Sequence, residues 1–371
     1  MERAKILIVG AGPGGLAVAR ALTAGGFAPH VVERESAWTG AGAGMFLPAN
    51  AFRALRVLKL DDAVAARGFR IRTQRLLDQR GRVLVEIDLA RLWGDVGPCL
   101  GIARAQLHDV LRHGVPVELG TAVRSLEQET GGPVLAGFTD SRRREYDLVI
   151  GADGIHSTVR RLIGDDRPPA PVGQRSWRFL TACPADVTAW TVWLGRRCSF
   201  LMVPLGNGLV YCYADATADP AADETTDPRT ELRWRFGAFG APVATILDQL
   251  PDASEIHQSF IEEVAVPSWG RGSTVLIGDA AHGMSPNMAQ GAALAFEDAV
   301  VLAACLRGSG SIADGVAEFA TRRGERTGWV RAQTHRRDRT RNLPAFLRDL
   351  TLRHLGTSII TANYAPLVLE P

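Results

Sequence analysis

The first hydrophobic run of the chain is short and is followed at once by glycines. The pattern predicts a buried strand at Lys5–Val9, an alanine-rich helix at Pro13–Ala24 and a second strand at His30–Glu33. Two glycines after the helix mark its end, because glycine readily adopts the backbone conformation of a helix C-cap. Together the three elements predict a βαβ unit, and therefore a parallel sheet with helices packed on its faces.

Farther along the chain, alternation of apolar and polar residues replaces the helical spacing. Trp177–Ala216 alternates in this way and is rich in β-formers, which predicts an antiparallel sheet. Its clearest strands are Trp190–Leu194, Phe200–Val203 and Leu209–Ala214. Further strands are expected at Arg70–Asp78, Arg82–Asp88, Val115–Leu119, Ala122–Gln128, Val134–Thr139, Leu148–Ile150 and Val275–Gly278. Further helices are expected at Ala49–Leu60, Arg104–Arg112, Arg229–Leu250 (broken at Pro242), Ala289–Leu306 and over most of residues 312–371, and an acidic loop at Ala218–Thr230.

Composition narrows the class of protein. The chain has 371 residues, 46% hydrophobic and 22% charged, which is typical of a globular protein of two or three domains. Its 42 Lys and Arg against 40 Asp and Glu predict no attraction to nucleic acid or to a membrane surface. Five cysteines without a C-x-x-C pair predict neither a disulfide framework nor a metal site. Because no signal peptide or long apolar run is found, we expect a cytoplasmic protein.

The glycines after the first strand have the spacing of a dinucleotide-binding loop. Gly10, Gly12 and Gly15 form G-x-G-x-x-G between the predicted strand and helix. In such a loop the first glycine permits a tight turn, the second lets a pyrophosphate approach the backbone, and the third lets the helix pack on the strand. The amides that begin the helix favour phosphate charge. Glu33, 18 residues after Gly15, is placed to accept the hydroxyls of a ribose.

Two further motifs follow the glycine loop. Gly151–Arg160 reads GADGIHSTVR, and Gly278–His282 reads GDAAH and is followed by Pro286 and Gly291. In this order and spacing the three motifs give the chain a resemblance, over nearly its whole length, to the FAD-dependent aromatic-ring hydroxylases. These are single-component (group A) flavoprotein monooxygenases built like p-hydroxybenzoate hydroxylase. The chain is most similar to their salicylate, hydroxynicotinate and urate hydroxylase branch.

The resemblance implies an α/β fold and an activity. The expected parts are a Rossmann-like FAD-binding domain at residues 1–70, 100–171 and 267–345, a smaller antiparallel-sheet substrate domain at residues 71–99 and 172–266, and a C-terminal helical tail at residues 346–371. The implied enzyme uses NADPH or NADH and O2 to hydroxylate an aromatic or polyketide-like small molecule through a flavin C4a-hydroperoxide. Open alternatives are a non-oxygenating FAD enzyme, such as a halogenase or reductase, and an idle FAD-binding protein that shields its ligand.

The resemblance also assigns cofactor contacts residue by residue. The FAD pyrophosphate is expected to contact Gly10, Gly12, Pro13, Gly14 and Gly15, and the adenosine ribose is expected to contact Glu33 and Arg34. Arg104 and Asp279 are expected beside the pyrophosphate and ribityl chain, and the Val123 backbone beside the adenine. Asp153 and Arg160 are expected to contact FAD and NAD(P)H, and Pro286, Gly291 and Ala292 to contact the flavin ring. At the last two positions, amides of a helix N-terminus can stabilise negative charge on the reduced flavin. Two alternatives stay open, in which Asp153 only caps a helix and Arg160 is a surface charge.

The candidate substrate pocket lies in the predicted antiparallel sheet. Its candidate wall residues are Trp177, Arg178, Trp193, Tyr211, Tyr213 and Pro286, with Trp190 as a further candidate. Tyr211 and Tyr213 are two residues apart on a strand and therefore share a face, whereas the tryptophans could instead be ordinary sheet packing. Because the flavin carries the chemistry, no protein nucleophile is expected. Tyr211, Tyr213 and Arg197 are the candidates for helping to deprotonate a phenol.

Two positions differ from the family pattern, and two other features are expected to be structural. Ala293 stands where the family commonly has Asn, so a side-chain contact with the flavin is lost. Ser199 stands where urate hydroxylases are expected to have a substrate-binding arginine, which argues against urate. The apolar and aromatic character of the pocket segment favours a substrate less charged than urate or salicylate. His282 is expected to be a packed residue rather than a base, and Arg336–Arg341 is expected to be a solvated helix face.

Overall fold

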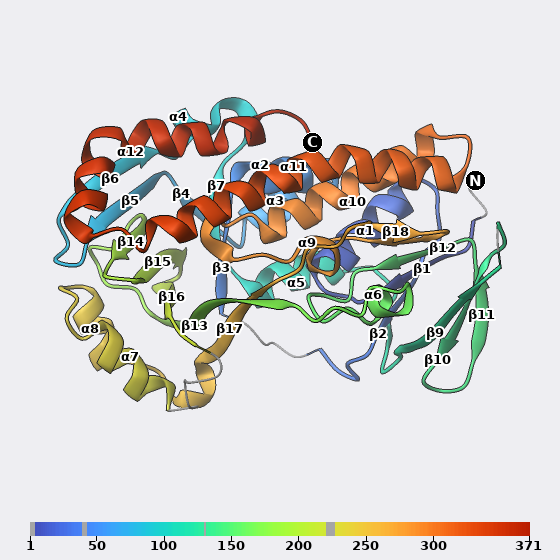
Figure 1. The fold of residues 1–371 in the computed structure, drawn as a ribbon, viewed down its shortest axis with the longest axis horizontal. Coiled ribbons are helices and arrows are strands. Elements are labelled where there is room, and N and C mark those ends of the chain that lie inside the picture. The colour runs from blue at the N-terminus through green and yellow to red at the C-terminus, as the bar shows by residue number, and fades with distance from the viewer. Residues whose placement is uncertain (1–3, 39–42, 130, 220–226) are drawn as a thin grey trace.

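The computed structural model describes residues 4–38, 43–129, 131–219 and 227–371. Most of the acidic loop expected at Ala218–Thr230 lies outside these residues. Two large sheets lie at opposite ends of the long axis, and the long helices α10 and α11 run along them (Figure 1). Among the described residues, one sheet has the strand order β18-β19-β12-β1-β2-β8, and we call it the N-terminal sheet. The other has the order β17-β13-β16-β15-β14-β5-β6, and we call it the mixed sheet.

The N-terminal sheet is built around the first strand of the chain. β1 (Ile6–Val9) pairs in parallel with β2 (His30–Glu33) and with β12 (Leu148–Gly151). The outer strands are β8 (Glu118–Leu119), β19 (Thr274–Leu276) and β18 (Gly270–Arg271). The predicted βαβ unit is confirmed, because α1 (Pro13–Ala24) joins β1 to β2 with the expected bounds.

Different elements cover the two faces of the N-terminal sheet. Ile6 and Ile8 pack on one face in a core that includes residues of α1 and α10 (Gly291–Gly308). Leu7 and Val9 point to the other face and pack against residues of a three-stranded sheet. The strands of that small sheet are β9 (Val123–Gln128), β10 (Val134–Phe138) and β11 (Arg143–Tyr146). Helices on or beside the N-terminal sheet are α2 (Ala49–Val57), α3 (Asp61–Ala65), α5 (Arg104–Arg112), α6 (Thr158–Leu162) and α9 (Asp279–His282).

The mixed sheet contains the predicted alternating strands. Its strands are β5 (Thr73–Asp78), β6 (Val83–Asp88), β13 (Ala170–Ala182), β14 (Trp190–Leu194), β15 (Cys198–Gly206), β16 (Leu209–Thr217) and β17 (His257–Glu263). Neighbouring strands are antiparallel except β14 and β5, which are parallel. The sequence does not predict the start of β13, where Pro171 and Gly173 are weak strand formers and the pairing with β17 shifts register. α7 (Pro228–Phe236) and α8 (Val243–Asp248) pack on one face of this sheet.

A second three-stranded sheet lies against the other face of the mixed sheet. It consists of β3 (Gly44–Leu47), β7 (Cys99–Ala103) and β4 (Phe69–Ile71), and the sequence does not predict β3 or β7. Gly44 in β3 lies so close to Tyr211 that an added Cβ would stand 2.6 Å from the Tyr211 Cβ. This approach places β3 directly over one end of the mixed sheet.

The two C-terminal helices complete the molecule. α11 (Ile312–Thr340) runs along α10, and α12 (Ala345–Val368) turns back over the mixed sheet beside α4 (Leu89–Trp93) (Figure 1). The expected tail is therefore a packed helix: Gly356 lies against Val85 of β6, and Arg348 donates hydrogen bonds to the carbonyl oxygens of Leu194 and Gly195. Among the described residues, none of the helices has the length and apolar character needed to cross a bilayer.

Candidate active site

The glycine loop has the shape that a bound pyrophosphate requires. Gly10 has φ +103°, and a Cβ there would stand 2.5 Å from the Ala152 carbonyl oxygen. A Cβ at Gly15 would overlap the Gly10 carbonyl oxygen, whereas a Cβ at Gly12 would meet no described atom within 4 Å. No side chain of the described residues caps α1 at Gly12, so its first amides remain available to an anion. The loop therefore fits a dinucleotide pyrophosphate.

The carboxylate that follows the loop is already held in place. Glu33 ends β2, and its Oε2 accepts a hydrogen bond from the Ala11 amide at 2.8 Å. Its Oε1 accepts a hydrogen bond from the Glu35 amide at 3.1 Å. An ionised carboxylate has about four acceptor positions, so Glu33 keeps capacity for ribose hydroxyls. Its neighbour Arg34 is exposed and lies 3.4 Å from the Glu35 carboxylate.

Asp153 and Arg160 join two of the sequence motifs. Asp153 accepts hydrogen bonds from the Ser157 hydroxyl and from two amides of α6, so the structure bears out its capping role. Burial raises the pKa of Asp153 and these hydrogen bonds oppose the rise. The surface-charge alternative for Arg160 is wrong, because the side chain is buried and its guanidinium donates to the carbonyl oxygens of Ala280 and Ile155. Arg160 thus ties the GADG motif to the GDAAH motif.

The N-terminus of α10 points into open space. A Cβ at Gly291 would meet no described atom within 4 Å, and the first turn has neither an acidic residue nor a side-chain cap. Such an N-terminus carries partial positive charge and favours negative charge in front of it. These features fit the pyrimidine end of a flavin. Ala293, where the family commonly has Asn, is buried in the core and offers no polar group.

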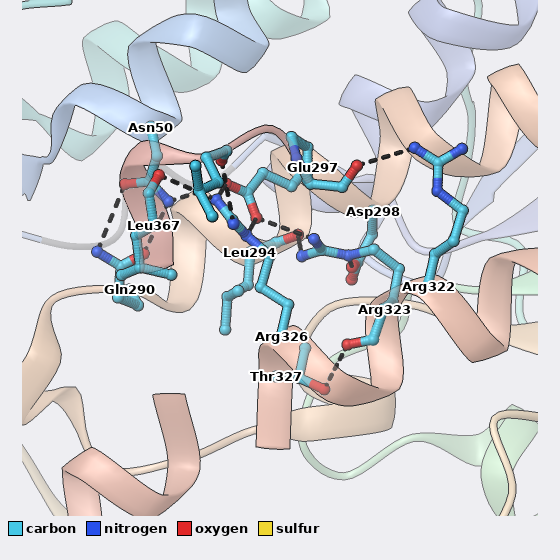
Figure 2. A network of polar contacts seen from close by, with 12 residues as sticks. Asn50, Gln290, Leu294, Glu297, Asp298, Arg322, Arg323, Arg326, Thr327 and Leu367 are labelled. Atoms are coloured by element: carbon cyan, nitrogen blue, oxygen red, sulfur yellow. Dashed lines mark hydrogen bonds and ion pairs between the residues drawn. The ribbon is translucent and has the colours of Figure 1, made fainter. Parts of the chain in front are cut away.

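A buried network of charges holds α10 in this position (Figure 2). Arg323 of α11 donates to Glu297 at 2.9 Å and to Asp298 at 2.7 Å, and Arg326 donates to both oxygens of Glu297. Asn50 of α2 donates to Glu297 and to Gln290, the residue that precedes α10. Burial opposes ionisation of these acids, but their cationic partners prevail and lower the pKa of Glu297.

His282 belongs to the same network. Its Nε2 lies 2.7 Å from Asp298 Oδ2, and its ring is buried against Trp269. Burial alone would raise the pKa of Asp298, but the charges of His282 and Arg323 lower it to about 2. The packed, hydrogen-bonded role expected for His282 is therefore what the structure has. That Arg323 and Arg326 bind Glu297 and Asp298, more than 20 positions earlier, was not foreseen from the sequence.

The remaining predicted cofactor residues lie around these elements. Arg104 begins α5 and is exposed, with its amide bonded to the Ala43 carbonyl oxygen. Asp279 begins α9 and is exposed, and Val123 begins β9 and is buried. Pro286 lies in a short 3-10 helix, Pro286–Met288, between α9 and α10. Their contacts with FAD stay predictions.

A cavity of about 450 Å³ lies between the mixed sheet, the Pro286–Ala292 segment and the helices α11 and α12. Among the predicted residues, its lining includes Tyr211, Tyr213, Arg197, Pro286, Gly291 and Ala292. Most other lining side chains are apolar, as ligand pockets commonly are. The sheet face, the N-terminus of α10 and the C-terminal helices thus meet at one cavity.

Two of the predicted wall residues point away from this cavity. Trp177 and Trp193 lie on the opposite face of the mixed sheet, buried with Phe236 of α7. Successive strand residues alternate between faces, so Trp190 lines the cavity whereas Trp193 does not. The expectation for Trp177 and Trp193 is therefore corrected, and ordinary sheet packing accounts for both. Arg178 is not part of the lining and lies beside the Tyr213 ring, 5.7 Å from its centroid.

The two tyrosines are not suited to act as bases. Burial raises the pKa of Tyr211 to about 12, and it also raises the pKa of Tyr213 well above its usual value. Both phenols therefore stay protonated at neutral pH and can donate hydrogen bonds. The Tyr213 hydroxyl already points to Asp215, at 3.4 Å from Oδ2.

The arginine-rich end of α11 is a solvated face only in part, because Arg336 and Arg339 are exposed whereas Arg337 and Arg341 are half-buried. Arg336, Arg337 and Arg341 line the cavity, and Arg341 donates to both oxygens of the fully buried Asp215. Ser199 also donates to Asp215. The expectation for Arg336–Arg341 therefore holds at Arg336 and Arg339 and is corrected at Arg341, because the buried carboxylate of Asp215 needs a cationic partner. A carboxylate at Asp215, within a strand of buried residues, was the sequence signal that could have revealed this pair.

Comparisons with known proteins agree with this geometry. A family model described as an FAD binding domain matches residues 3–314. An aurachin C monooxygenase/isomerase of Stigmatella aurantiaca is 35% identical over 329 residues, which cover 86% of this chain and 85% of that protein. A 2-heptyl-3-hydroxy-4(1H)-quinolone synthase of Pseudomonas aeruginosa is 32% identical over 312 residues, which cover 80% of this chain and 79% of that protein.

A solved structure extends the likeness to the whole fold. HpxO of Klebsiella pneumoniae, crystallised with FAD and uric acid, has a TM-score of 0.91 and 25% identity, and the match covers 99% of this chain and 97% of that one. The relatives are monooxygenases, and the glycine loop and the α10 N-terminus fit the cofactor that the family model names. The chain therefore belongs to the FAD-binding family of aromatic-ring monooxygenases, and it is an FAD-dependent monooxygenase.

Proposed function

We propose that this monooxygenase uses NAD(P)H and O2 to hydroxylate a nitrogen heteroaromatic compound held in the cavity of the mixed sheet. The observation that carries the proposal is a largely apolar cavity that includes the first turn of α10 in its lining. A relative is a 2-heptyl-3-hydroxy-4(1H)-quinolone synthase, which makes a quinolone the first ring to test. A cytoplasmic location, where reduced nicotinamide nucleotides are available, is part of the same proposal.

The proposal gives each end of FAD its own residues. The glycine loop and the N-terminus of α1 would hold the pyrophosphate, with Arg104 and Asp279 beside it, and Glu33 would hold the ribose. Pro286, Gly291 and Ala292 would contact the flavin ring, and the Val123 backbone would contact the adenine. When bound, FAD supplies the redox chemistry, in which electrons from NAD(P)H activate O2 and one oxygen atom enters the substrate ring.

The protein residues around the cavity bind, orient and protect. Leu76, Val192 and Leu201 on the sheet give the cavity an apolar wall, which excludes water from a reactive oxygen species. The amides of Gly291 and Ala292 would stabilise negative charge on the flavin. Protonated Tyr211 and Tyr213 can donate hydrogen bonds to an oxygen of the substrate but cannot remove its proton at neutral pH.

The test measures NADPH and NADH oxidation in air, with and without 4(1H)-quinolones, phenols and polycyclic aromatic compounds. A quinolone should accelerate the oxidation and should gain one oxygen atom by mass spectrometry. If FAD binds but no compound accelerates the oxidation or gains oxygen, the proposal fails. That result would favour the alternative of an idle FAD-binding protein. A product that carries a halogen, or that is only reduced, would favour the non-oxygenating alternatives.

A matched pair of variants links the activity to the cavity. Leu201→Trp places a large side chain inside the lining and should abolish the substrate-stimulated oxidation while FAD stays bound. Leu209→Trp changes an exposed leucine at the start of β16 and should leave the rate within about twofold. Equal activity in both variants would show that the reaction takes place elsewhere.

A further inference from the structure

Exposed apolar side chains gather where α11 ends and α12 begins. Among the described residues, fourteen large apolar side chains are exposed, and six of them lie in the short segment 343–359. Phe346, Leu347 and Leu350 are neighbours on the outer side of α12, and Phe346 is 76% exposed. The other three are Leu343, Leu355 and Ile359. Single exposed apolar residues are common on protein surfaces, whereas a cluster of this kind marks a site of contact with another surface.

This cluster borders an opening of the cavity. The cavity-lining residues Arg336, Leu343 and Ile359 are exposed, and they come from α11, from the turn after it and from α12. Two other exposed lining residues, Pro286 and Gly291, lie where the flavin ring is expected. The cavity therefore also meets the surface at residues 336–359, which we call the α11–α12 corner and which lie at the mixed-sheet end of the molecule (Figure 1).

The α11–α12 corner is also basic. Residues 336–354 include six arginines and two aspartates, which give this segment a formal charge of +4, whereas the whole chain has a formal charge of +2. Both aspartates are already bonded within the protein, Asp349 to Arg348 and Asp338 to the side-chain amide of Gln174. The arginines of the corner with exposed side chains are Arg336, Arg339 and Arg353. The corner therefore presents positive charge beside its apolar side chains.

This combination fits an anionic lipid bilayer better than a second copy of the chain. A bilayer offers phosphate groups to the arginines and hydrocarbon to the apolar side chains, and helices with basic and apolar residues bind such surfaces. A twofold contact between two copies would bring the arginines of both corners together, and like charges repel. The near balance of charge in the whole chain, from which the sequence predicts no attraction to a membrane surface, averages over this corner.

We propose that the α11–α12 corner docks on the anionic surface of a lipid bilayer, with Phe346, Leu347 and Leu350 in the headgroup region and the exposed arginines at the lipid phosphates. The protein then lies on the bilayer, and none of its described helices could cross it. Docking places an opening of the cavity against the lipid, where an apolar compound enters without passing through water. The inference goes beyond the proposed function, because binding to a bilayer does not depend on the reaction.

The test measures co-sedimentation of the FAD-loaded protein with lipid vesicles, without substrate or reductant. One set of vesicles is pure phosphatidylcholine, which has no net charge, and the other is an equimolar mixture of phosphatidylcholine and anionic phosphatidylglycerol. We expect the unaltered protein to bind the anionic vesicles at least about 10-fold more tightly than the neutral ones. Raising the salt from about 0.1 M to about 1 M should remove most of this preference, because salt screens the attraction between exposed charges.

A matched pair of double variants tests the apolar contacts. Phe346→Ser with Leu350→Ser removes two exposed apolar side chains of the corner and should weaken binding to the anionic vesicles at least about 10-fold. The control, Trp234→Ser with Leu209→Ser, also removes one exposed aromatic residue and one exposed leucine, but from α7 and from the start of β16. It should leave the affinity within about twofold. Thermal unfolding and FAD content show whether each variant is folded.

A second pair separates local charge from total charge. Arg339→Gln with Arg353→Gln should weaken binding to the anionic vesicles at least about fivefold, because two exposed cations of the corner are lost. The control, Arg307→Gln with Arg144→Gln, lowers the net charge by the same amount at exposed positions of α10 and β11. It should leave the affinity within about twofold, because these positions lie outside the docking surface.

Each outcome decides the inference. It is overturned if the protein binds neither kind of vesicle, binds both kinds equally, or loses as much affinity in the control variants as in those of the corner. A dimer in light scattering that Phe346→Ser with Leu350→Ser dissociates, without binding to vesicles, makes the corner a contact between copies and also overturns it. If a variant fails to fold, the two kinds of vesicle and the salt dependence still decide. Selective binding without substrate-stimulated NAD(P)H oxidation leaves this inference standing and contradicts only the proposed function.

Discussion

The glycine loop and the cavity face of the mixed sheet obey different kinds of constraint. In the loop, a Cβ at Gly15 would collide with the Gly10 carbonyl oxygen, and a Cβ at Gly10 would collide with the carbonyl oxygen of Ala152, which follows β12. In the sheet, Trp190 and Trp193 are both buried on one strand, and only their position relative to distant helices decides which one meets the ligand. A local steric constraint can be recognised in a sequence, whereas the face of the sheet that will meet the cavity cannot.

The largest expected effect comes from the loop. Gly15→Ala should lower the free energy of unfolding by about 3 kcal/mol or more and abolish FAD retention, because its Cβ would overlap the Gly10 carbonyl. Gly12→Ala places its Cβ in open space and should fold normally but bind FAD at least tenfold more weakly. Thermal unfolding and the absorbance of bound flavin measure the two effects. Equal stability of the two variants would contradict the steric difference between positions 15 and 12.

The second-largest expected effect tests the buried ion pairs between α10 and α11. Arg323→Met leaves Glu297 and Asp298 buried without their shared cation and should cost about 3–5 kcal/mol in unfolding free energy. The control is the adjacent Arg322→Met, whose partner Glu318 is exposed, and it should cost less than about 1 kcal/mol. Urea unfolding at pH 7 measures both. A small loss in Arg323→Met would show that α10 does not depend on this network.

A third prediction concerns pH. The pKa of Asp298 is held at about 2, below the ordinary value of about 3.9 that it takes in the unfolded chain. Its contribution is therefore present above pH 4 and is lost as the pH falls toward 2, by roughly 2 kcal/mol. Urea unfolding between pH 6 and pH 2.5 should show a shallower pH dependence in Asp298→Asn than in the unaltered protein. Identical slopes would contradict the low pKa.

The smallest effect is expected from the tyrosines of the sheet. Because burial raises the pKa of Tyr211 to about 12 and raises that of Tyr213 well above its usual value, neither ionises between pH 6 and pH 9. Tyr211→Phe and Tyr213→Phe should therefore keep the shape of the kcat profile over this range, even where a lost hydrogen bond lowers the rate severalfold. Loss of a titration near neutral pH in either variant would identify that tyrosine as the base.

Much of the fold could be predicted because its signals are local. α1, β2, α5 and β14 have the bounds that periodicity and glycine positions predict. β3 and β7 escaped prediction because they are short and contain Gly44 and Gly101, which weaken a strand pattern. β3 brings Met45 and Phe46 to the cavity, so part of the candidate site was missed together with that strand.

The sequence by itself determined the βαβ unit, the glycines that leave room for a pyrophosphate, and the alternation that makes the mixed sheet. Only the tertiary structure decided that Trp190 rather than Trp193 faces the cavity, and that Arg341 pairs with Asp215, 126 positions earlier. The physical reason is range. The collision of a Gly15 Cβ with Gly10 and the alternation of strand residues act within a few residues, whereas the face of a sheet and the partner of a buried charge depend on elements that meet only after folding.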